Sequence, residues 1–221
     1  MNVIEALKQR KSVRAFLNKP VSDETIHTLL DAARHSPSGT NTQPWQVAIV
    51  KGNCKLTLQE KIETAFRNGD SGKADFNYYP KEWISPFKDR RKECGLLMYT
   101  TLGIKRENKE RQMDQWAANY RAFDAPVMIL FFMNPIMENG SFLDYGMFLQ
   151  SIMLAAEELG LATCPQASLS DYPHIIKPAL EYGEDSILLC GIALGYEDKD
   201  AQINSYRTSR LAVDEFTQFF D

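Results

Sequence analysis

The spacing of apolar residues along the chain predicts a series of helices. An amphipathic helix is expected between Ser22, a capping residue, and Pro37. Its apolar residues follow the i, i+3, i+4, i+7 spacing of one helix face: Ile26, Leu29, Leu30 and Ala33. Four more helical segments are expected: one from the capping residue Asn2 to about residue 10, one over 54–67, and two charged helices over 87–121 with a break near Gly103.

Short apolar runs predict strands at 46–51, 127–133, 161–167 and 187–196. The run 127–133 is apolar at every position, which is typical of a buried strand. A helix with Pro173 near its start separates the last two strands. Residues 68–86 show no period and predict a long loop, which is usually functional or mobile.

A longer helix is predicted from Ser141, with Asp144 at the capping-box position, through Leu159. It is apolar on nearly all sides, so it is expected in a core or an interface. The segment after Gly195 has no core period but contains apolar residues, Val213, Phe216, Phe219 and Phe220. This segment is either an arm that docks on a second subunit or a tail that packs on its own domain. No repeat or linker divides the chain, so residues 1–221 are expected to form one domain.

The composition is that of an ordinary globular protein. The chain has 221 residues, 44% of them hydrophobic, and a net charge of −4, which gives no global field for nucleic acid. The first residues form neither a charged leader nor a long apolar run, so no secretion signal and no membrane span are expected. The four cysteines are scattered without a C-x-x-C pair, which favours reduced thiols in a cytoplasmic protein.

Familiar catalytic motifs are missing from the sequence. It contains no G-x-G-x-x-G, P-loop, H-E-x-x-H or G-x-S-x-G motif, and the three histidines are too dispersed to predict a metal site. An acid–base pair cannot be selected from 29 scattered carboxylates. If the chain is an enzyme, its reactive group is expected to come from a cofactor.

Residues 10–16 (RKSVRAF) concentrate positive charge in an acidic protein. If the chain is extended there, Arg10, Ser12 and Arg14 point the same way and can follow an elongated anionic ligand. The alternative is a solvated helix face. Residues 206–210 (YRTSR) offer a second cluster of arginine and hydroxyl groups.

Residues 36–45 (SPSGTNTQPW) predict a stiff polar loop between a helix and a strand. Pro37 and Pro44 fix φ and lack an N–H, while Gly39 can adopt a positive φ. The Ser, Thr, Asn and Gln groups of this loop suit a planar ligand with polar edges.

Taken in order, these segments resemble the FMN-dependent nitroreductase family. Besides 10–16 and 36–45, the resemblance rests on 124–127 (DAPV), 144–150 (DYGMFLQ), 160–166 (GLATCPQ), 191–195 (GIALG) and 207–210 (RTSR). It covers nearly the whole chain, and residues 163–166 are similar to the nitrobenzene and nitrobenzoate reductase branch.

The resemblance implies an α+β fold with a mostly antiparallel central sheet flanked by helices. It also implies a homodimer in which the C-terminal arm is exchanged and the FMN sites lie in the interface. In that arrangement the apolar helix 142–159 becomes the dimer core, and residues 68–86 become part of a mobile wall over the substrate.

The same resemblance assigns the cofactor-binding residues. Those matching the phosphate and ribityl contacts are Arg10, Arg210, the second phosphate candidate Arg207, Lys11 and Ser12. Arg14 matches a cation beside flavin N1 and O2, where negative charge accumulates on reduction. Residues beside flavin N5 are matched by Pro165, Gln166 and Ala167. Contacts from the opposite subunit are matched by Pro37, Ser38 and Asn41. Thr208 stands where many relatives have lysine or arginine, so this chain departs from the family pattern in its phosphate shell.

The implied activity is a two-step hydride relay from NADH or NADPH through FMN to a nitroaromatic or quinone-type acceptor. No protein residue is assigned a catalytic role, because the flavin carries the chemistry. Two alternatives stay open: the same fold acting in reductive dehalogenation or dehydrogenation, and a flavin-binding protein without turnover. The motifs choose neither the coenzyme nor the acceptor.

Overall fold

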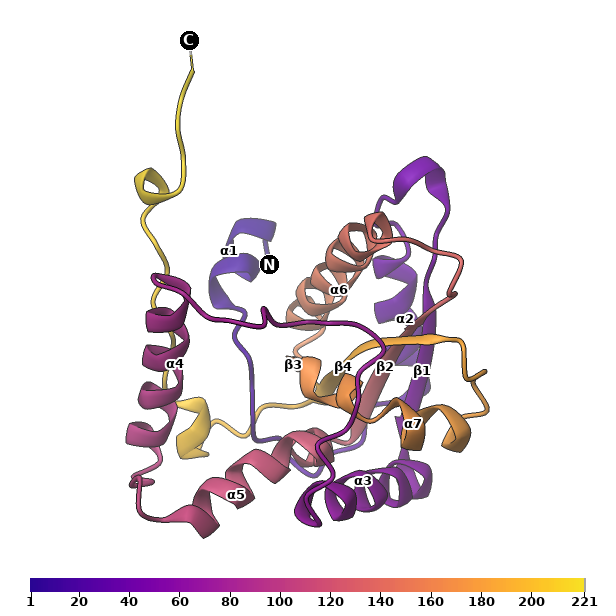
Figure 1. The fold of residues 1–221 in the computed structure, drawn as a ribbon. Helices are drawn as coiled ribbons and strands as arrows, with labels where there is room; N and C mark the ends of the chain where they lie inside the picture. The colour runs from indigo at the N-terminus through magenta and orange to yellow at the C-terminus, as the bar shows by residue number, and fades with distance from the viewer. Residues whose placement is uncertain (221) are drawn as a thin grey trace.

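A four-stranded antiparallel sheet lies at the centre of the computed structural model, which describes residues 1–220 (Figure 1). The strands are β1 (Gln46–Lys51), β2 (Val127–Met133), β3 (Ala162–Gln166) and β4 (Ile187–Gly195), in the order β1-β2-β4-β3. All three pairings are antiparallel, and that of β2 with β4 runs from Val127↔Leu194 to Met133↔Ile187 with a register shift between Phe131 and Phe132. The predicted strands and the α+β class are confirmed.

Strand β2 explains why its sequence is apolar at every position. All seven of its residues are buried, and they alternate between two hydrophobic clusters, one on each face of the sheet. Val127, Ile129, Phe131 and Met133 belong to the first cluster; Met128, Leu130 and Phe132 belong to the second. A strand covered on both faces needs apolar side chains in both directions.

Helices cover both faces of this sheet. Among residues 1–220 they are α1 (Val3–Gln9), α2 (Asp23–Ala33), α3 (Gly52–Arg67), α4 (Phe87–Thr101), α5 (Lys109–Ala117), α6 (Gly140–Glu158) and α7 (Pro173–Ala179). Helices α2 and α6 pack on the first cluster, and α3 and α7 pack on the second. The caps predicted at Asn2 and Ser22 are present. None of these helices is long and apolar enough to cross a bilayer.

The start of α6 differs from the prediction. Asn139 occupies the cap position, and Ser141 lies inside the helix. The expected box is absent because the helix begins before Ser141, and the Asp144 carboxylate instead accepts a 3.1 Å hydrogen bond from the Gly39 amide, in the polar loop. The helix is buried along one side, yet Leu143 is 75% exposed and Met147 40% exposed. Residues 1–220 of a single chain therefore leave part of this apolar helix exposed.

Residues 68–86 form neither helix nor strand, as predicted, and cross from α3 to α4 in front of the sheet (Figure 1). The first half of the segment is anchored. Gly72 has a φ of +68°, and a Cβ there would collide with the backbone oxygen of Asp171. Asp75 accepts 2.8 Å hydrogen bonds from Lys177 Nζ and from the Leu188 amide. The crossing thus has a fixed starting point.

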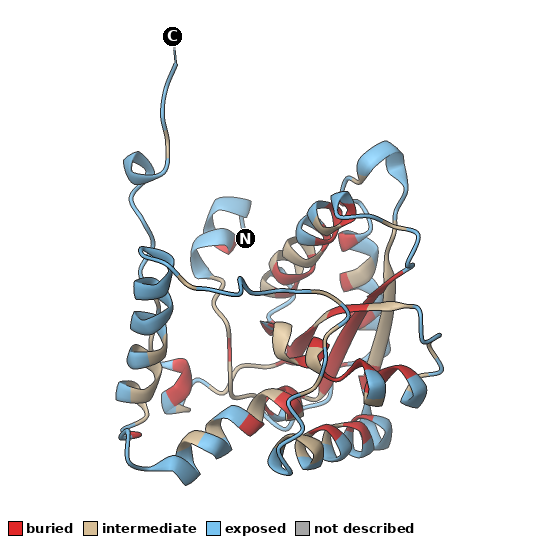
Figure 2. Ribbon diagram, in the orientation of Figure 1, coloured by how far each residue is buried: buried red, intermediate tan, exposed pale blue. Residues whose placement is uncertain are grey.

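Helix α4 stands apart from the core. It contributes no buried residue, and it is mostly exposed along its length (Figure 2). The segment after β4 runs beside it, and a cavity of about 500 Å³ lies between α4 and residues 208–211. The chain end then projects away from the molecule, and Phe216, Phe219 and Phe220 are 66%, 83% and 88% exposed. The apolar tail does not pack on its own chain.

Candidate functional site

The cationic segment is extended and lies beside β3. Ser12 forms a parallel bridge with Thr163, and the Val13 amide donates a 3.0 Å hydrogen bond to the Thr163 carbonyl oxygen. Val13 is buried, whereas Arg10, Lys11, Ser12 and Arg14 line a cavity of about 210 Å³. The extended alternative holds, and the helix-face alternative is wrong, because α1 ends at Gln9.

The C-terminal cluster completes the same cavity. Tyr206, Arg207, Thr208 and Arg210 line it together with the residues of the first segment. Tyr206 accepts a 3.2 Å hydrogen bond from Arg14 Nη1. The two predicted arginine clusters, which lie at opposite ends of the sequence, therefore form one site.

Most of the positive charge in this cavity is uncompensated. Lys11 pairs with Glu197 at 2.7 Å, but Arg10, Arg14, Arg207 and Arg210 form no ion pair with any residue of 1–220. Partial burial, followed by the nearby charge of Arg210, lowers the pKa of the Arg10 guanidinium.

The hydrogen bonding of Arg10 also leaves its guanidinium without an anionic partner among the described residues. Its side chain donates to the sulfur of Met153 at 3.9 Å and to no oxygen of the described chain. A guanidinium carries five N–H donors, and those of the half-buried Arg10 that Met153 does not take are open to the cavity that Arg10 lines. A ligand with several anionic oxygens fits this arrangement.

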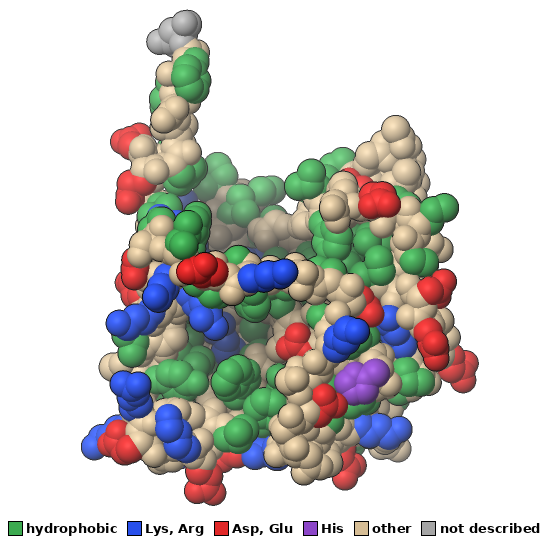
Figure 3. All heavy atoms as spheres, in the orientation of Figure 1, with side chains coloured by type: hydrophobic (Ala, Val, Ile, Leu, Met, Phe, Trp, Pro, Cys, Tyr) green, Lys and Arg blue, Asp and Glu red, His purple; other side chains and the backbone are tan. Residues whose placement is uncertain are grey.

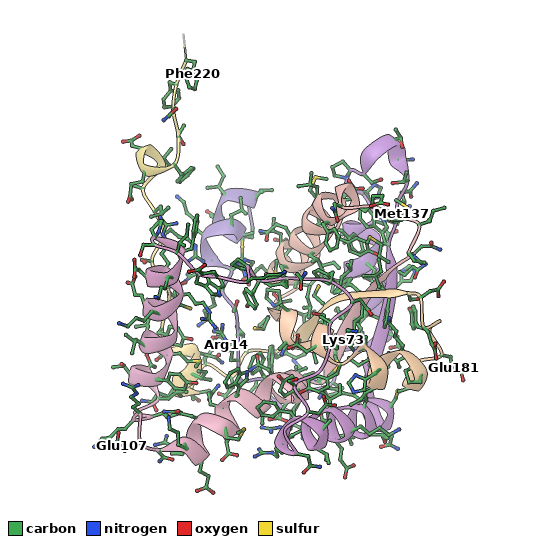
Figure 4. All side chains as sticks on the ribbon, in the orientation of Figure 1. Arg14, Lys73, Glu107, Met137, Glu181 and Phe220 are labelled. Carbon is green, nitrogen blue, oxygen red and sulfur yellow. The ribbon has the colours of Figure 1, made fainter. Side chains whose placement is uncertain are left out.

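A larger cavity of about 660 Å³ adjoins the cationic one, with Arg14 lining both. Helix α4 forms one wall, through residues that include Arg91 and Tyr99, and α5 forms another, through Trp116. Figure 4 shows Arg14 in the hollow between these helices and the sheet. The volume is within the range of small-molecule sites.

Buried polar atoms without a hydrogen-bond partner lie in the polar loop 36–45 and at β3 with the turn that follows it. In the part of the chain that the structure describes, four buried side-chain atoms have no hydrogen-bond partner: Thr163 Oγ1, Gln166 Oε1, Ser168 Oγ and Trp45 Nε1. The first three lie on β3 and the turn after it, beside the cationic segment. Gln166 is held at its other end, because its Nε2 donates a 2.7 Å hydrogen bond to the Asn119 oxygen. Pro165 is exposed and Ala167 half-buried in the same stretch.

The polar loop is rigidly attached to α6. Tyr145 Oη accepts a 2.9 Å hydrogen bond from the Gln46 amide and donates to the Pro44 oxygen at 2.7 Å. Trp45 stacks on Phe148 with ring centroids 4.5 Å apart. Within the loop, the non-glycine residues Thr40, Asn41 and Gln43 have positive φ values of 48°, 60° and 49°, and the Gln43 amide donates a 2.9 Å hydrogen bond to Ser38 Oγ.

The loop does not join the cationic site of its own chain. Pro37, Ser38 and Asn41 line neither of the two cavities that share Arg14. Figure 1 places the loop beyond the far end of β1, beside α6. Within one chain the predicted site residues therefore form two separate groups.

Asn204 is a site residue that sequence reasoning missed. It is 3% exposed, and its Oδ1 accepts a 2.8 Å hydrogen bond from the Arg14 amide. Its Nδ2 donates to the Ala15 and Asp198 oxygens at 2.9 and 2.8 Å. A single asparagine in an irregular segment gives no signal in a sequence, so only the fold reveals this support.

The chain belongs to the nitroreductase family. A sequence model of that family matches residues 7–196. The 4-nitrobenzoate reductase of Pseudomonas putida is 34% identical over 210 residues, covering 95% of this chain and 92% of the relative. The nitrobenzene nitroreductase of Ectopseudomonas oleovorans is 32% identical over 216 residues, covering 97% and 95%.

Solved structures agree over the full length. The chain is similar to the FMN and NADPH-dependent nitroreductase NfnB of Sphigopyxis sp. strain HMH, with a TM-score of 0.96, 35% identity and 100% coverage of both chains. The FMN-dependent nitroreductase NfnB of Mycobacterium smegmatis, solved in complex with NADPH, gives a TM-score of 0.92 at 32% identity, again with 100% coverage of both. The predicted family and fold are confirmed.

Proposed function

We propose that this protein is an FMN-dependent NAD(P)H oxidoreductase that reduces nitroaromatic or quinone-type acceptors. The observation that carries the proposal is the cluster of unpaired arginines at one end of a cavity that continues into a larger hollow. A phosphate suits the arginines, and a ring system with its reaction partner suits the hollow. The names of the relatives support the same chemistry.

The residues of the site fit FMN. Arg10 and Arg210, with Arg207 as a second candidate, supply cations for a phosphate. The Lys11 side chain is engaged by Glu197, which leaves its backbone, together with the Ser12 hydroxyl, for the ribityl chain. The flavin ring is proposed to lie beside the end of β3 and the turn after it, at Pro165, Gln166 and Ala167. In this stretch Gln166 has a buried side-chain oxygen without a hydrogen-bond partner.

When bound, FMN supplies the two-electron transfer, accepting hydride from NAD(P)H and passing it to the acceptor. For a nitro group, one hydride and one proton from solvent give a nitroso group and water, so atoms and electrons balance. The protein's part is to bind and orient. Arg14 lines both cavities, which suits it to stabilise negative charge that develops on the ring system.

We also infer that the chain acts as a homodimer with an exchanged C-terminal arm. The exposed side of α6 and the phenylalanines of the arm are apolar surfaces that none of residues 1–220 covers. In this proposal the partner's Pro37, Ser38 and Asn41 complete the FMN site, which accounts for their distance from the arginines of their own chain. Residues 1–221 then form one FMN-binding domain, which we propose to be cytoplasmic.

The test is an absorbance spectrum of the purified protein followed by anaerobic titration with NADPH and NADH. Flavin bands that bleach on titration, and recover on addition of nitrobenzene or a quinone, are the expected result. NADPH is the expected donor, in line with the NfnB relatives. Bleaching without recovery by any acceptor would indicate a flavin-binding protein without turnover, and recovery by halogenated phenols alone would indicate a dehalogenase.

A further inference from the structure

Arg14 is held through both its backbone and its side chain by the segment that follows β4. Its amide donates a 2.8 Å hydrogen bond to Asn204 Oδ1, and its Nη1 donates to the Tyr206 hydroxyl at 3.2 Å. Asn204 and Tyr206 come from the opposite end of the sequence. The segment 204–206 therefore supports both the backbone position and the side-chain direction of Arg14.

The segment that holds Arg14 is itself anchored. Asn204 is buried, and its Nδ2 donates to the backbone oxygens of Ala15 and Asp198 at 2.9 and 2.8 Å. Its backbone oxygen accepts a 2.5 Å hydrogen bond from Lys11 Nζ. Tyr206 follows directly after this anchor and is half-buried in the wall of the cationic cavity. The tyrosine hydroxyl is thus supported beside the guanidinium.

The bond to Tyr206 uses one nitrogen of the guanidinium. Nη1 donates to the Tyr206 hydroxyl and, at 3.5 Å, to the Ser12 backbone oxygen, whereas Nε and Nη2 of Arg14 donate to no residue of 1–220. Arg14 lines both the cationic cavity and the hollow of about 660 Å³. One nitrogen of the guanidinium is therefore held by the chain, and the other N–H groups remain for a ligand in these cavities.

Tyr206 orients Arg14 without neutralising it. Burial raises the pKa of the Tyr206 phenol above its ordinary value of about 10, against the opposing effect of Arg14, so the phenol is uncharged at pH 7. None of the described residues that line the two cavities is an aspartate or glutamate. Figure 3 shows the hollow with Lys and Arg side chains at its edge over α4. A carboxylate in place of the phenol would cancel the charge of Arg14, whereas a neutral oxygen leaves that charge in the site.

We propose that Tyr206 is a positioning residue that acts through Arg14 and raises the reduction potential of the bound flavin. A guanidinium already held in one orientation stabilises developing negative charge without having to reorganise. Negative charge accumulates on the ring system when FMN is reduced, so the contribution of Tyr206 is made to the reduced form. This inference rests on the proposed function, since FMN is the group whose potential is set.

The test is Tyr206→Phe, which removes the hydroxyl and keeps the ring. Fluorescence quenching measures the affinity for oxidised FMN, and spectroelectrochemistry at pH 7 measures the midpoint potential. We expect the affinity for oxidised FMN to change less than about twofold, and the affinity for reduced FMN to fall about tenfold. For a two-electron couple, a tenfold change corresponds to a midpoint potential that is lower by about 30 mV.

Tyr182→Phe is the matched control. It removes the same hydroxyl from a half-buried tyrosine that lines neither of the two cavities. The Tyr182 ring stacks on Phe132, with centroids 3.6 Å apart, and the substitution keeps that contact. We expect the midpoint potential and the affinity for oxidised FMN to equal those of wild type.

A double-mutant cycle with Arg14→Gln shows whether the tyrosine acts through the arginine. FMN is kept in excess of its Kd, so that weaker binding by Arg14→Gln does not empty the site. In this background Tyr206→Phe has no guanidinium to orient. We expect it to change the ratio of the affinities for oxidised and reduced FMN by less than about twofold.

Three results would overturn the inference. The first is an unchanged midpoint potential in Tyr206→Phe, including the case in which oxidised and reduced FMN lose affinity equally. The second is a full shift of the potential by Tyr206→Phe in the Arg14→Gln background, because the hydroxyl would then act on the flavin directly. The third is an equal shift in Tyr182→Phe. A wild-type protein that holds FMN but reduces no acceptor would contradict the proposed function, whereas the potentials would still decide the role of Tyr206.

Discussion

The Nη2 atom of Arg207 lies 2.7 Å from the backbone oxygen of Arg10, and it also donates to the Gln9 oxygen at 2.6 Å. Arg207 thus closes the end of α1 and fixes the segment after the last strand against the cationic segment. Together with the hydrogen bonds from Arg14 to Asn204 and Tyr206, this contact joins the two arginine clusters that line one cavity.

Arg207→Ala should loosen that junction. We expect FMN affinity to fall by about tenfold, because bonds from a charged donor contribute about 1.5–3 kcal/mol and this one is partly exposed. The measurement is FMN binding by fluorescence quenching, with Lys199→Ala as an exposed control. An affinity equal to wild type would show that Arg207 neither holds the junction nor binds the phosphate.

Arg10→Gln and Arg210→Gln should each weaken FMN binding by about 10- to 100-fold, since each removes a cation proposed to bind the phosphate. Riboflavin lacks the phosphate, so its affinity should change less than about twofold. Arg106→Gln, an exposed arginine outside the site, serves as the control. An equal loss of affinity for FMN and riboflavin would contradict the proposal that these arginines bind the phosphate.

Asp144→Ala should release the polar loop, because the Gly39 amide loses its acceptor and the positive φ values at Thr40 and Asn41 lose a support. We expect weaker FMN binding and faster proteolysis of the loop. Asp144→Asn keeps an acceptor oxygen and should restore most of the binding. Identical behaviour of the two variants would contradict a role for this hydrogen bond.

Replacing Phe216, Phe219 and Phe220 together with Ser should shift the protein from dimer to monomer and lower FMN affinity with it. The reason is that these exposed side chains are proposed to pack on the partner. Sedimentation velocity at several FMN concentrations gives both quantities. Ile136→Ser removes another apolar side chain, 80% exposed, and should change neither. A monomer with full FMN affinity would refute the shared site.

Lys55 should make stability depend on pH. It is 5% exposed, its Nζ donates to Gln59 Oε1 at 2.7 Å, and burial lowers its pKa to about 8. The unfolded chain keeps this proton until about pH 10.4. Below pH 8 the folded state therefore carries the full cost of the buried charge, and this cost is relieved as pH rises from 8 to 10.4.

The corresponding variant is Lys55→Met. It should be more stable than wild type near pH 7 by on the order of 2–3 kcal/mol, and this advantage should shrink by pH 10. Urea unfolding at pH 7, 8.5 and 10 measures the difference. Lys61→Met, on the exposed side of the same helix, should differ from wild type in free energy of unfolding by the same amount at all three pH values. An advantage of Lys55→Met that does not vary with pH would show that the pKa of Lys55 is not lowered in the fold.

Local patterns determined most of the elements. The Asn2 and Ser22 caps, the α2 stripe and the apolar run of β2 are set by near neighbours in the chain, so the sequence alone predicts them. The Ser141 cap was wrong because α6 begins at Gly140 with Asn139 at its cap position, and Asp144 accepts instead from a distant partner, the Gly39 amide. A tertiary hydrogen bond of this kind leaves no periodic trace.

The sequence by itself determined the family, the sheet strands and the two arginine clusters, because motif order and short-range periodicity carry that information. The resemblance already implied that Arg10 and Arg210 bind one phosphate and that the polar loop serves the opposite subunit. Only the tertiary structure decided that Asn204 supports the Arg14 backbone and that Tyr206 accepts a hydrogen bond from the Arg14 side chain. It alone also decided which cations of α4 face the hollow, since helix orientation depends on what packs against each side. These contacts join residues that are far apart in the sequence, so no local sequence pattern predicts them.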